Sequence, residues 1–198
     1  MKTQVLSIHP RFPELDKIAQ CVRVLKNGGL VVIPTDTVYG VVADSRNPKA
    51  MEKLRHVKKR PADKPFAILI ARKDMIDELG GNVDRCVYKL IDEFWPGPLT
   101  VIVPSNQGTK TIGVRMPNNT IALGLLKEIQ APLAAPSANL ADNKPPVTCQ
   151  EALMDMDGLV DLAIDGGPAG LGKESSVVDA STLPPRVLRE GPIKQQDV

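Results

Sequence analysis

The stretch at residues 28–45, GGLVVIPTDTVYGVVADS, decides the fold of this chain. An apolar run at 30–33 stops at Pro34, which predicts a short strand buried on both faces, and a Thr-Asp-Thr turn with Tyr39 and Gly40 follows. A helix-like segment comes next and leads into a cationic stretch at 55–65, RHVKKRPADKP. Because open α/β sheets bind small anionic ligands at the carboxyl ends of their strands, this order of features favours a nucleotide-handling enzyme.

The totals of the sequence narrow the class of protein. A length of 198 residues suits one well-buried domain, and a formal net charge of +2 does not favour a nucleic-acid coat protein. Aromatic residues make up 3% of the chain, which weakens any interpretation that depends on aromatic base stacking. We find no apolar run of membrane-spanning length and no signal-peptide pattern at the N-terminus, so we expect a cytoplasmic protein.

The three cysteines, Cys21, Cys86 and Cys149, are far apart and include no CxxC pair. This spacing suggests neither a disulfide framework nor a zinc site. We therefore expect buried, reduced thiols, which fit the cytosol.

Helix and strand patterns alternate along the chain, which predicts an α/β fold. The helix expected at 13–26 would bury Leu15, Ile18, Ala19, Val22 and Leu25 and end at a glycine pair. The expected strands lie at 5–8, 30–33, 66–70, 99–103, 112–115, 133–135, 159–164, 177–179 and 187–189, and further helices at 84–94, 119–129 and after 47 and 148. No helix separates 103 from 112, so the sheet should be mixed. We expect one domain over 1–193 and a frayed polar tail at 194–198.

The cationic stretch has two readings. Seven basic residues between Lys49 and Lys64 could form a solvated helix face, or the loop that carries most of them could bind anions. The position after a strand-end turn favours the second reading, because loops on a rigid scaffold concentrate binding residues.

Other polar groups also follow predicted strands. Ser137 and Asn139 could bind one ligand or only their own backbone. Arg115 and Arg189 each end a strand, so each is either solvated or faces a ligand anion. The glycine-rich loop at 166–172 does not match a phosphate-binding GxxxxGK[ST] loop and is either a lid or a plain connection.

Two kinds of chemistry find little support. The two histidines, His9 and His56, lie in the terminal segment and among cations, which argues against a Ser-His-acid triad. No carboxylate pair forms a metal-ligand motif, so any magnesium would be carried by substrate phosphates rather than by protein ligands.

Seven motifs in order resemble those of the YrdC/Sua5/TsaC family of threonylcarbamoyl-AMP synthases: PTDTVYG, KKRPADKP, WPGPLT, TIGVRMP, APSAN, ESSVVD and LREGPI. The resemblance covers about 28–193, and the chain ends where the family's catalytic domain ends. We therefore expect the short TsaC type without the additional C-terminal domain of the Sua5 type.

The resemblance implies a fold and a reaction. The fold is a YrdC-like twisted mixed sheet, parallel and antiparallel, flanked by helices around a concave basic cavity. The reaction joins L-threonine, bicarbonate or CO2, and ATP into threonylcarbamoyl-AMP and pyrophosphate, with Mg2+ on ATP. The product would pass to the machinery that modifies tRNA to threonylcarbamoyladenosine.

The resemblance also assigns residues. The catalytic and ATP-binding groups would be Lys58, Arg60, Ser137 and Asn139, with Thr111, Pro145 and Arg189 also on the nucleotide side. The threonine pocket would contain Thr35, Thr37, Tyr39, Arg115 for the carboxylate, Ala135, and Ser175 or its neighbour Ser176. The chain departs from the family at Ala141-Asp142, where Ser-Gly is common, and at Ser175-Ser176, where Ser-Thr is common.

Two alternatives compete with the synthase. A concave basic face could bind double-stranded RNA or tRNA by shape and phosphate contacts, without synthase activity. A carbamoyl-transfer domain of the hydrogenase-maturation type shares the expected fold, but it belongs to long chains with zinc-finger and acylphosphatase modules. Weak tRNA binding is also compatible with the synthase.

Overall fold

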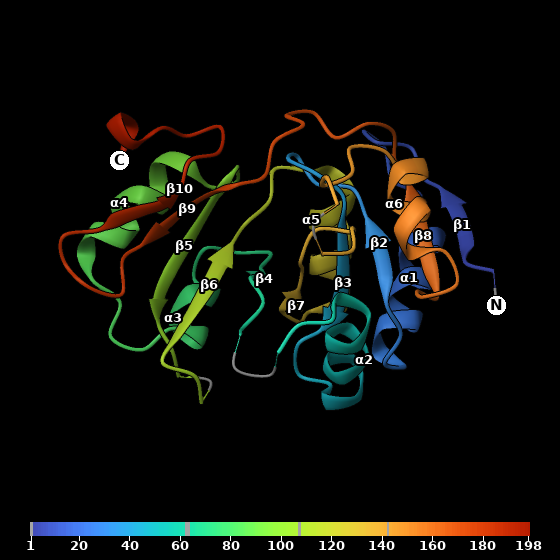
Figure 1. Cartoon of the computed structure of the whole chain (residues 1–198), viewed down its shortest axis with the longest axis horizontal. Coiled ribbons are helices and arrows are strands. Elements are labelled where there is room, and N and C mark those ends of the chain that lie inside the picture. Colours follow the sequence, from blue (N-terminus) through green and yellow to red (C-terminus); the bar gives the residue numbers. More distant parts are fainter. Residues whose placement is uncertain (1, 62–63, 107, 142) are drawn as a thin grey trace.

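The computed structural model describes residues 2–61, 64–106, 108–141 and 143–198 of the chain. These residues form a 10-stranded sheet with the strand order β1-β8-β2-β3-β7-β4-β6-β5-β9-β10 (Figure 1). The strands are β1 Gln4–Ser7, β2 Val31–Ile33, β3 Gly40–Asp44, β4 Ile68–Leu69, β5 Leu99–Pro104, β6 Thr111–Arg115, β7 Leu133–Ala134, β8 Leu162–Asp165, β9 Ser176–Asp179 and β10 Arg186–Arg189. The helices are α1 Leu15–Lys26, α2 Pro48–Lys58, α3 Met75–Leu79, α4 Arg85–Phe94, α5 Thr120–Ile129, α6 Cys149–Met156 and the 3-10 helix η1 Gln195–Asp197.

The sheet is mixed, as the sequence predicted. Strand β8 lies parallel to β1 and β2, whereas β3 runs antiparallel to both β2 and β7. The pair β5 and β6, joined without a helix, is antiparallel, and β5 also pairs in parallel with β9. The expected α/β class with a mixed sheet is therefore confirmed.

One strand was not predicted. The helix expected after residue 47 is α2, but the segment between Tyr39 and this helix forms strand β3, and all five of its residues are buried. It pairs with β2 so that Val31 lies opposite Val42. The run Val-Val-Ala is short and continuously apolar, and such runs do not distinguish a strand from a buried helix by periodicity. The turn 34–39 therefore connects two neighbouring antiparallel strands.

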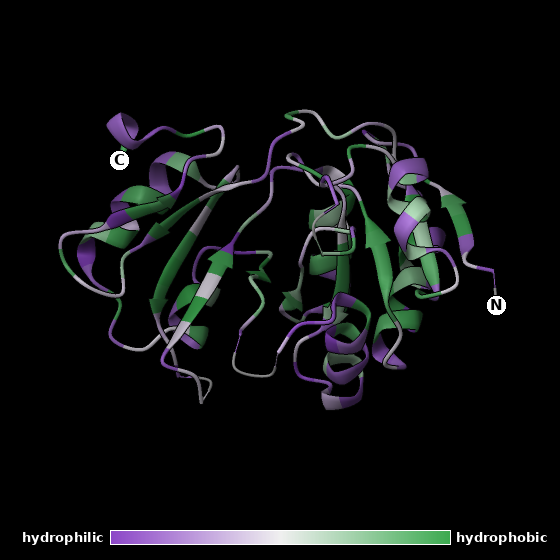
Figure 2. Ribbon diagram, viewed as in Figure 1, coloured by the Kyte–Doolittle hydropathy of each residue, from purple (hydrophilic) through white to green (hydrophobic). Residues whose placement is uncertain are grey.

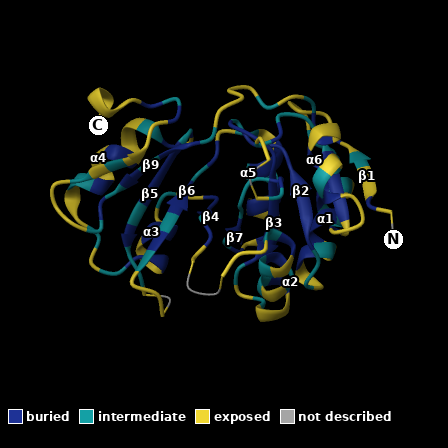
Figure 3. Cartoon of the chain, viewed as in Figure 1, coloured by how far each residue is buried: buried dark blue, intermediate teal, exposed yellow. Residues whose placement is uncertain are grey.

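Helix α1 buries Ile18, Cys21, Val22 and Leu25 as expected, but Leu15 is 82% exposed. Leu15 is the first helical residue and precedes the turns that pack on the sheet, so its place in the apolar pattern does not indicate burial. Figure 3 shows that the central strands are buried, whereas many loops and outer helix surfaces are exposed. Two further expectations differ: Cys86 is only partly buried, and the tail residues 195–197 form a 3-10 helix instead of fraying.

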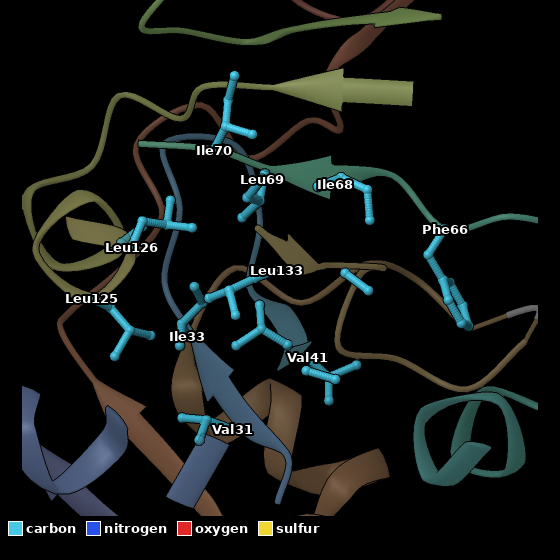
Figure 4. Packing of buried hydrophobic residues seen from close by; sticks show 14 of the residues in the cluster. Val31, Ile33, Val41, Phe66, Ile68, Leu69, Ile70, Leu125, Leu126 and Leu133 are labelled. Carbon is cyan, nitrogen blue, oxygen red and sulfur yellow. The ribbon is translucent and has the colours of Figure 1, made fainter. Parts of the chain in front are cut away.

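The hydrophobic core follows the sheet. Apolar residues occupy the strands and the inner sides of the helices, while polar residues cover the outer helix surfaces (Figure 2). Figure 4 shows buried apolar side chains of this core that come from the strands β2, β3, β4 and β7 and from helix α5. This packing fixes the strand ends that carry the polar residues described below. Within the described part of the chain, no helix combines the length and apolar character needed to cross a membrane.

Candidate active site

A cavity of about 700 Å³ lies over the faces of β4, β5, β6 and β9 and beside the C-terminal end of α2. This volume is in the range of small-molecule sites. Its lining includes the basic residues Lys58, Lys59, Arg60, Lys64, Arg115 and Arg189, the polar residues Thr37, Thr100, Thr111, Ser137, Asn139 and Ser175, and the wall residue Ala135. Of the fourteen residues that the sequence assigned to the site, ten therefore line one cavity.

Helix α2 delivers the first cation. Asn47 caps the helix, which the sequence predicted to start after residue 47, by accepting hydrogen bonds from the backbone N–H groups of Lys49 and Ala50 at 3.0 and 3.3 Å. The helix ends when Lys59 adopts a left-handed conformation with φ of 47°. Lys58 is the last residue of the helix, and it lines the cavity instead of belonging to a solvated helix face.

The Lys58 ammonium group donates three hydrogen bonds across the cavity. Its Nζ lies 2.8 Å from the Ser137 carbonyl oxygen, also contacts the Asn139 carbonyl oxygen, and lies 3.3 Å from Asn139 Oδ1. Burial lowers the pKa of Lys58 to about 8, and the nearby Arg60 charge adds to this effect, while Asp155 and Glu174 oppose it. The Lys58 ammonium group is therefore fixed in position by hydrogen bonds and carries its charge at neutral pH.

Arg60 is held by its own loop and by an aromatic ring. Its guanidinium donates to the carbonyl oxygens of Lys64 at 3.2 Å and Pro65 at 2.7 Å. It also lies 5.1 Å from the centre of the Phe66 ring, which Arg55 approaches at 5.4 Å. Burial lowers the pKa of Arg60 and the Arg55 charge adds to this effect, but an arginine remains charged at any physiological pH.

Ser137 and Asn139 both line the cavity, and their side chains also contact each other. The sequence left open whether they bind a ligand or form hydrogen bonds within their own turn, and this position allows both. The Ser137 hydroxyl donates to Asn139 Oδ1 at 2.6 Å, and the Asn139 amide donates to the Asn143 carbonyl oxygen. The backbone of this turn is fixed to the strand region, since Ala138 N–H donates to the Tyr39 carbonyl oxygen at 2.9 Å. The pair therefore forms a rigid polar wall facing Lys58.

Arg115 is buried at the other end of the cavity, where it is neither solvated nor without a counterion. Its Nη2 donates to Asp36 Oδ1 at 2.6 Å, its Nη1 to Thr37 Oγ1 at 2.8 Å, and its Nε to the Gly97 carbonyl oxygen at 3.0 Å. Burial lowers the pKa of Arg115, the Asp36 carboxylate opposes this, and the Arg189 charge adds to it. Within the described residues, three of the five guanidinium N–H donors are engaged, which leaves one on Nη1 and one on Nη2.

Arg189 stands on β10 at the rim of the cavity. Its Nη1 lies 2.9 Å from Glu174 Oε2, and its Nε donates to the Ser175 carbonyl oxygen at 3.1 Å. Its Nη2 also reaches Ser175 Oγ at 3.4 Å. Arg189 is therefore partly solvated and paired with a carboxylate that itself lines the cavity.

Four of the expected site residues lie outside the cavity lining. Thr35 organises the turn, because its hydroxyl donates to the Val38 carbonyl oxygen at 2.6 Å. Tyr39 is buried, and its hydroxyl donates to the Gly167 carbonyl oxygen at 2.5 Å. Pro145 lies in a half-buried loop, and Ser176 points to the opposite side of β9 from Ser175.

Ser175 and Ser176 can therefore be told apart. Successive residues of a strand point to opposite faces, and Ser175 lines the cavity with Val177. The Ser176 hydroxyl is buried and fully engaged, donating to the Ile193 carbonyl oxygen at 2.7 Å and accepting from Gly191 N–H at 2.9 Å. The Ser176 side chain therefore does not line the cavity, and it holds the C-terminal segment at Gly191 and Ile193.

The glycine-rich loop 166–172 does not contribute to the cavity lining. It is tied down by Ala169 N–H, which donates to the Val147 carbonyl oxygen at 2.8 Å, and by Leu171 N–H, which donates to the Asp36 carbonyl oxygen at 2.9 Å. The expected difference at Ala141-Asp142 falls partly outside the described residues, because the structure describes Ala141, which lines the cavity, but not Asp142.

Three residues of the site, Asp36, Thr100 and Glu174, could not be assigned from the sequence. The sequence predicts only that Asp36 belongs to a turn, whereas its carboxylate is the counterion of Arg115. Thr100 lies within the quoted WPGPLT motif, and its side chain faces the cavity because it belongs to the same sheet face as Arg115. Glu174 directly precedes Ser175, and its partner Arg189 is distant in sequence.

The structure is an α/β sheet whose cavity is lined by cations, hydroxyls and the amide of Asn139, which is a lining suited to small anionic ligands. A model of the Sua5/YciO/YrdC family, described as "Telomere recombination", matches residues 23–191. The chain belongs to this family.

Similar proteins include the threonylcarbamoyl-AMP synthase of Bacillus subtilis (strain 168), 36% identical over 191 residues, which cover 92% of this chain and 55% of that protein. A crystal structure of P. abyssi Sua5 complexed with L-threonine matches with a TM-score of 0.94 and 34% identity, over 98% of this chain and 59% of that one. The structure of E. coli YciO matches with a TM-score of 0.90 and 28% identity, over 98% of both chains. The chain thus spans 55 to 59% of the length of the first two proteins.

Proposed function

We propose that this chain, as one catalytic domain over residues 1–193, forms L-threonylcarbamoyl-AMP and pyrophosphate from L-threonine, bicarbonate or CO2, and ATP. The observation that carries the proposal is that Lys58, Arg60, Ser137, Asn139 and Arg115 line one cavity. Support comes from the family, from relatives named threonylcarbamoyl-AMP synthase, and from a similar structure that contains L-threonine.

The reaction has two steps. The amine of threonine forms an N–C bond to CO2 and loses a proton, which gives a carbamate. A carbamate oxygen then attacks the α-phosphorus of ATP, a P–O bond to that phosphorus forms, and the bond to the β-phosphate oxygen breaks to release pyrophosphate. Both reactants are anions, so the cavity must supply positive charge and hold a short-lived intermediate next to ATP.

We assign the threonine end of the site to the region around Arg115. The two unused N–H groups of its guanidinium suit a carboxylate, which arginine binds in a bidentate manner. Thr37 lines the cavity beside Arg115 and orients it, Ser175 lies directly before β9, and Ala135 forms part of the wall. Thr35 and Tyr39 would support this end from outside by fixing the turn and the adjoining loop.

We assign the ATP end to the region around Lys58. Its ammonium group and the Arg60 guanidinium would balance charge that moves to the leaving pyrophosphate. Ser137 and Asn139 would hold phosphate or adenylate oxygens through their hydroxyl and amide groups. The remaining nucleotide-side residues of the proposal are Thr111 and Arg189 in the cavity lining, and Pro145 in the adjoining loop.

Magnesium would enter with ATP. The described residues contain no group of three or more His, Cys, Asp or Glu side chains that could hold a metal ion. Among the described residues that line the cavity, only Glu174 carries a carboxylate, and this carboxylate pairs with Arg189. This donor set suits an ion whose ligands are mostly phosphate oxygens and water, and such an ion would neutralise phosphate charge.

We further propose a cytoplasmic protein whose product passes to the tRNA threonylcarbamoyl-transfer machinery. Exposed basic residues in the cavity rim, among them Lys59 and Lys64, would permit weak contact with tRNA phosphates. Such contact would be salt-dependent and secondary to the synthase reaction.

The test is pyrophosphate release from ATP and magnesium, with threonine and bicarbonate omitted in turn. Release that requires both is the expected result. Release that does not depend on threonine would indicate another acceptor. A chain that releases no pyrophosphate but binds RNA with steep salt dependence would favour the binding-module alternative.

A further inference from the structure

Four adjacent strands place a row of polar side chains along one side of the cavity. Arg115 ends β6, Thr100 lies on β5, and both line the cavity from neighbouring antiparallel strands. On the other side of β5, Thr100 is paired with Val177 of β9, and Val177 is paired in turn with Arg189 of β10. Thr100 therefore stands between the two arginines in the order of the strands.

The orientation of Thr100 is fixed by its neighbours. The side chain is buried, with 5% exposure, and its Oγ1 lies 2.9 Å from Ser175 Oγ. Its methyl group points the other way, since a Cβ built on Gly113 of β6 would lie 3.4 Å from it. The hydroxyl is thus directed to β9 and the methyl to β6, in a single rotamer.

The two hydroxyls leave one hydrogen without an acceptor. The pair Thr100 and Ser175 has two O–H groups, and the bond between their oxygens uses one hydrogen. Ser175 Oγ also accepts a long hydrogen bond of 3.4 Å from Arg189. Within the described residues, the second hydrogen has no further partner, although the pair is buried. A buried donor of this kind costs free energy unless a ligand or water accepts from it.

We infer that Thr100 is a specificity-determining residue, and that with Ser175 it forms a hydroxyl pair that recognises the side-chain hydroxyl of the amino-acid substrate. This inference rests on the proposed function and goes beyond it by naming the group that distinguishes threonine from amino acids without a hydroxyl. The role of Thr100 is to hold Ser175 and to complete the pair.

The chemistry of the row favours a hydroxyl as the ligand group. The arginines at either end of the row suit anions, and the free N–H groups of Arg115 already provide for the substrate carboxylate. Between the two arginines, the hydroxyl pair of Thr100 and Ser175 offers both a donor hydrogen and acceptor lone pairs. A hydroxyl group of the ligand, which also donates and accepts hydrogen bonds, would match this pair. An amino acid that binds Arg115 through its carboxylate and extends its side chain along the row would meet Thr100 and Ser175.

The test compares L-threonine with L-2-aminobutyrate, which lacks the hydroxyl, in pyrophosphate release by the whole chain. A site that hydrogen-bonds a hydroxyl rejects the analogue without it strongly, so we expect a preference of at least about 100-fold in kcat/KM. Thr100→Val keeps the methyl contact at Gly113 and removes the hydroxyl. It should reduce the preference about tenfold or more, mainly through a higher KM for threonine, with KM for ATP unchanged within about twofold.

Thr100→Ser is the matched control, because it keeps the hydroxyl and removes the methyl. It should retain the preference within about threefold. If Thr100→Val does not fold, Ser175→Ala removes the other hydroxyl of the pair and should reduce the preference in the same way. A purely structural role would lower kcat/KM for both amino acids equally and leave their ratio unchanged.

The outcomes separate the two proposals. If the wild-type chain releases pyrophosphate with threonine and folded Thr100→Val keeps the preference within about twofold, the inference for Thr100 is wrong and the proposed function stands. A loss of preference in Thr100→Ser equal to that in Thr100→Val would also overturn it. If the wild-type chain shows no threonine-dependent release, the proposed function fails, and the inference fails with it.

Discussion

The substitution Asp36→Ala removes the carboxylate that faces the Arg115 guanidinium. The side chains of this ion pair are 10% and 8% exposed, respectively, and Oδ1 and Nη2 lie 2.6 Å apart. Removing one partner of a buried pair costs about 3–5 kcal/mol, because the remaining charge is left uncompensated. Two other guanidinium contacts, to Gly97 and Thr37, remain, so we expect a loss of about 3 kcal/mol in the free energy of unfolding.

Urea denaturation followed by circular dichroism would measure this loss. In thermal unfolding, 1 kcal/mol corresponds to about 2–4 °C for a chain of this size, so Tm should fall by about 6–12 °C. The matched control is Asp74→Ala. Its partner Arg72 is 61% and Asp74 66% exposed, and the Asp74 side chain makes no helix-capping hydrogen bond. This control should change the unfolding free energy by less than about 1 kcal/mol.

A double variant tests the cause. Asp36→Ala combined with Arg115→Met removes both charges and replaces the guanidinium by an apolar side chain, so it should recover most of the stability that Asp36→Ala loses. If Asp36→Ala costs less than about 1 kcal/mol, or if the two substitutions are simply additive, the reasoning about an uncompensated buried charge is wrong.

The remaining predictions concern activity and helix capping. Lys58→Ala and Arg60→Ala should each reduce pyrophosphate release at least about 100-fold while the circular dichroism spectrum is unchanged, with exposed Lys49→Ala as the control; near-normal rates would remove these residues from the proposed mechanism. Because burial lowers the pKa of Lys58 to about 8, the ammonium charge is lost as pH rises through this value. The kcat/KM for ATP should therefore decline above about pH 8, and Lys58→Arg should move the decline to higher pH; an identical profile would contradict this assignment. Thr148→Ala removes the hydroxyl that accepts from Glu151 N–H at 3.1 Å at the start of α6, and should cost about 1 kcal/mol by urea denaturation, whereas no measurable change would show that this cap does not contribute.

Local patterns predicted most elements of the fold because the responsible signals lie within a few residues. The side chains of Asn47, Asn119 and Thr148 each accept a capping hydrogen bond, and α2, α5 and α6 begin directly after them, within one residue of the predicted starts. The pattern failed at β3 and at Leu15, where position in the tertiary structure, not local preference, decides what is buried. Strand order could not be predicted, since it depends on pairings between distant segments such as β5 and β9.

The difference between local signals and contacts of distant segments also applies to the site. Residues carried by recognisable motifs, such as Lys58 and Ser137, could be selected from the sequence and lie in one cavity. Partners of those residues could not be selected, because their role arises only from contact in space. The Glu174 carboxylate reaches Arg189 only because β9 and β10 pair. Which of two neighbouring serines faces the cavity likewise depended on the register of β9.

The contacts within the cavity imply different behaviour at its two ends. At the proposed ATP end, Lys58 and Arg60 contact mainly carbonyl oxygens, and a phosphate can replace such neutral acceptors with a net gain in charge complementarity. At the proposed threonine end, Arg115 has a buried carboxylate partner that a substrate would displace only at high cost, so a carboxylate must bind to the two free N–H groups. Threonine would therefore enter a site whose arginine is already oriented, while ATP would bind by exchanging contacts of Lys58 and Arg60. This difference predicts that substitutions near Arg115 act mainly on KM for threonine, whereas substitutions at Lys58 and Arg60 act on the reaction with ATP.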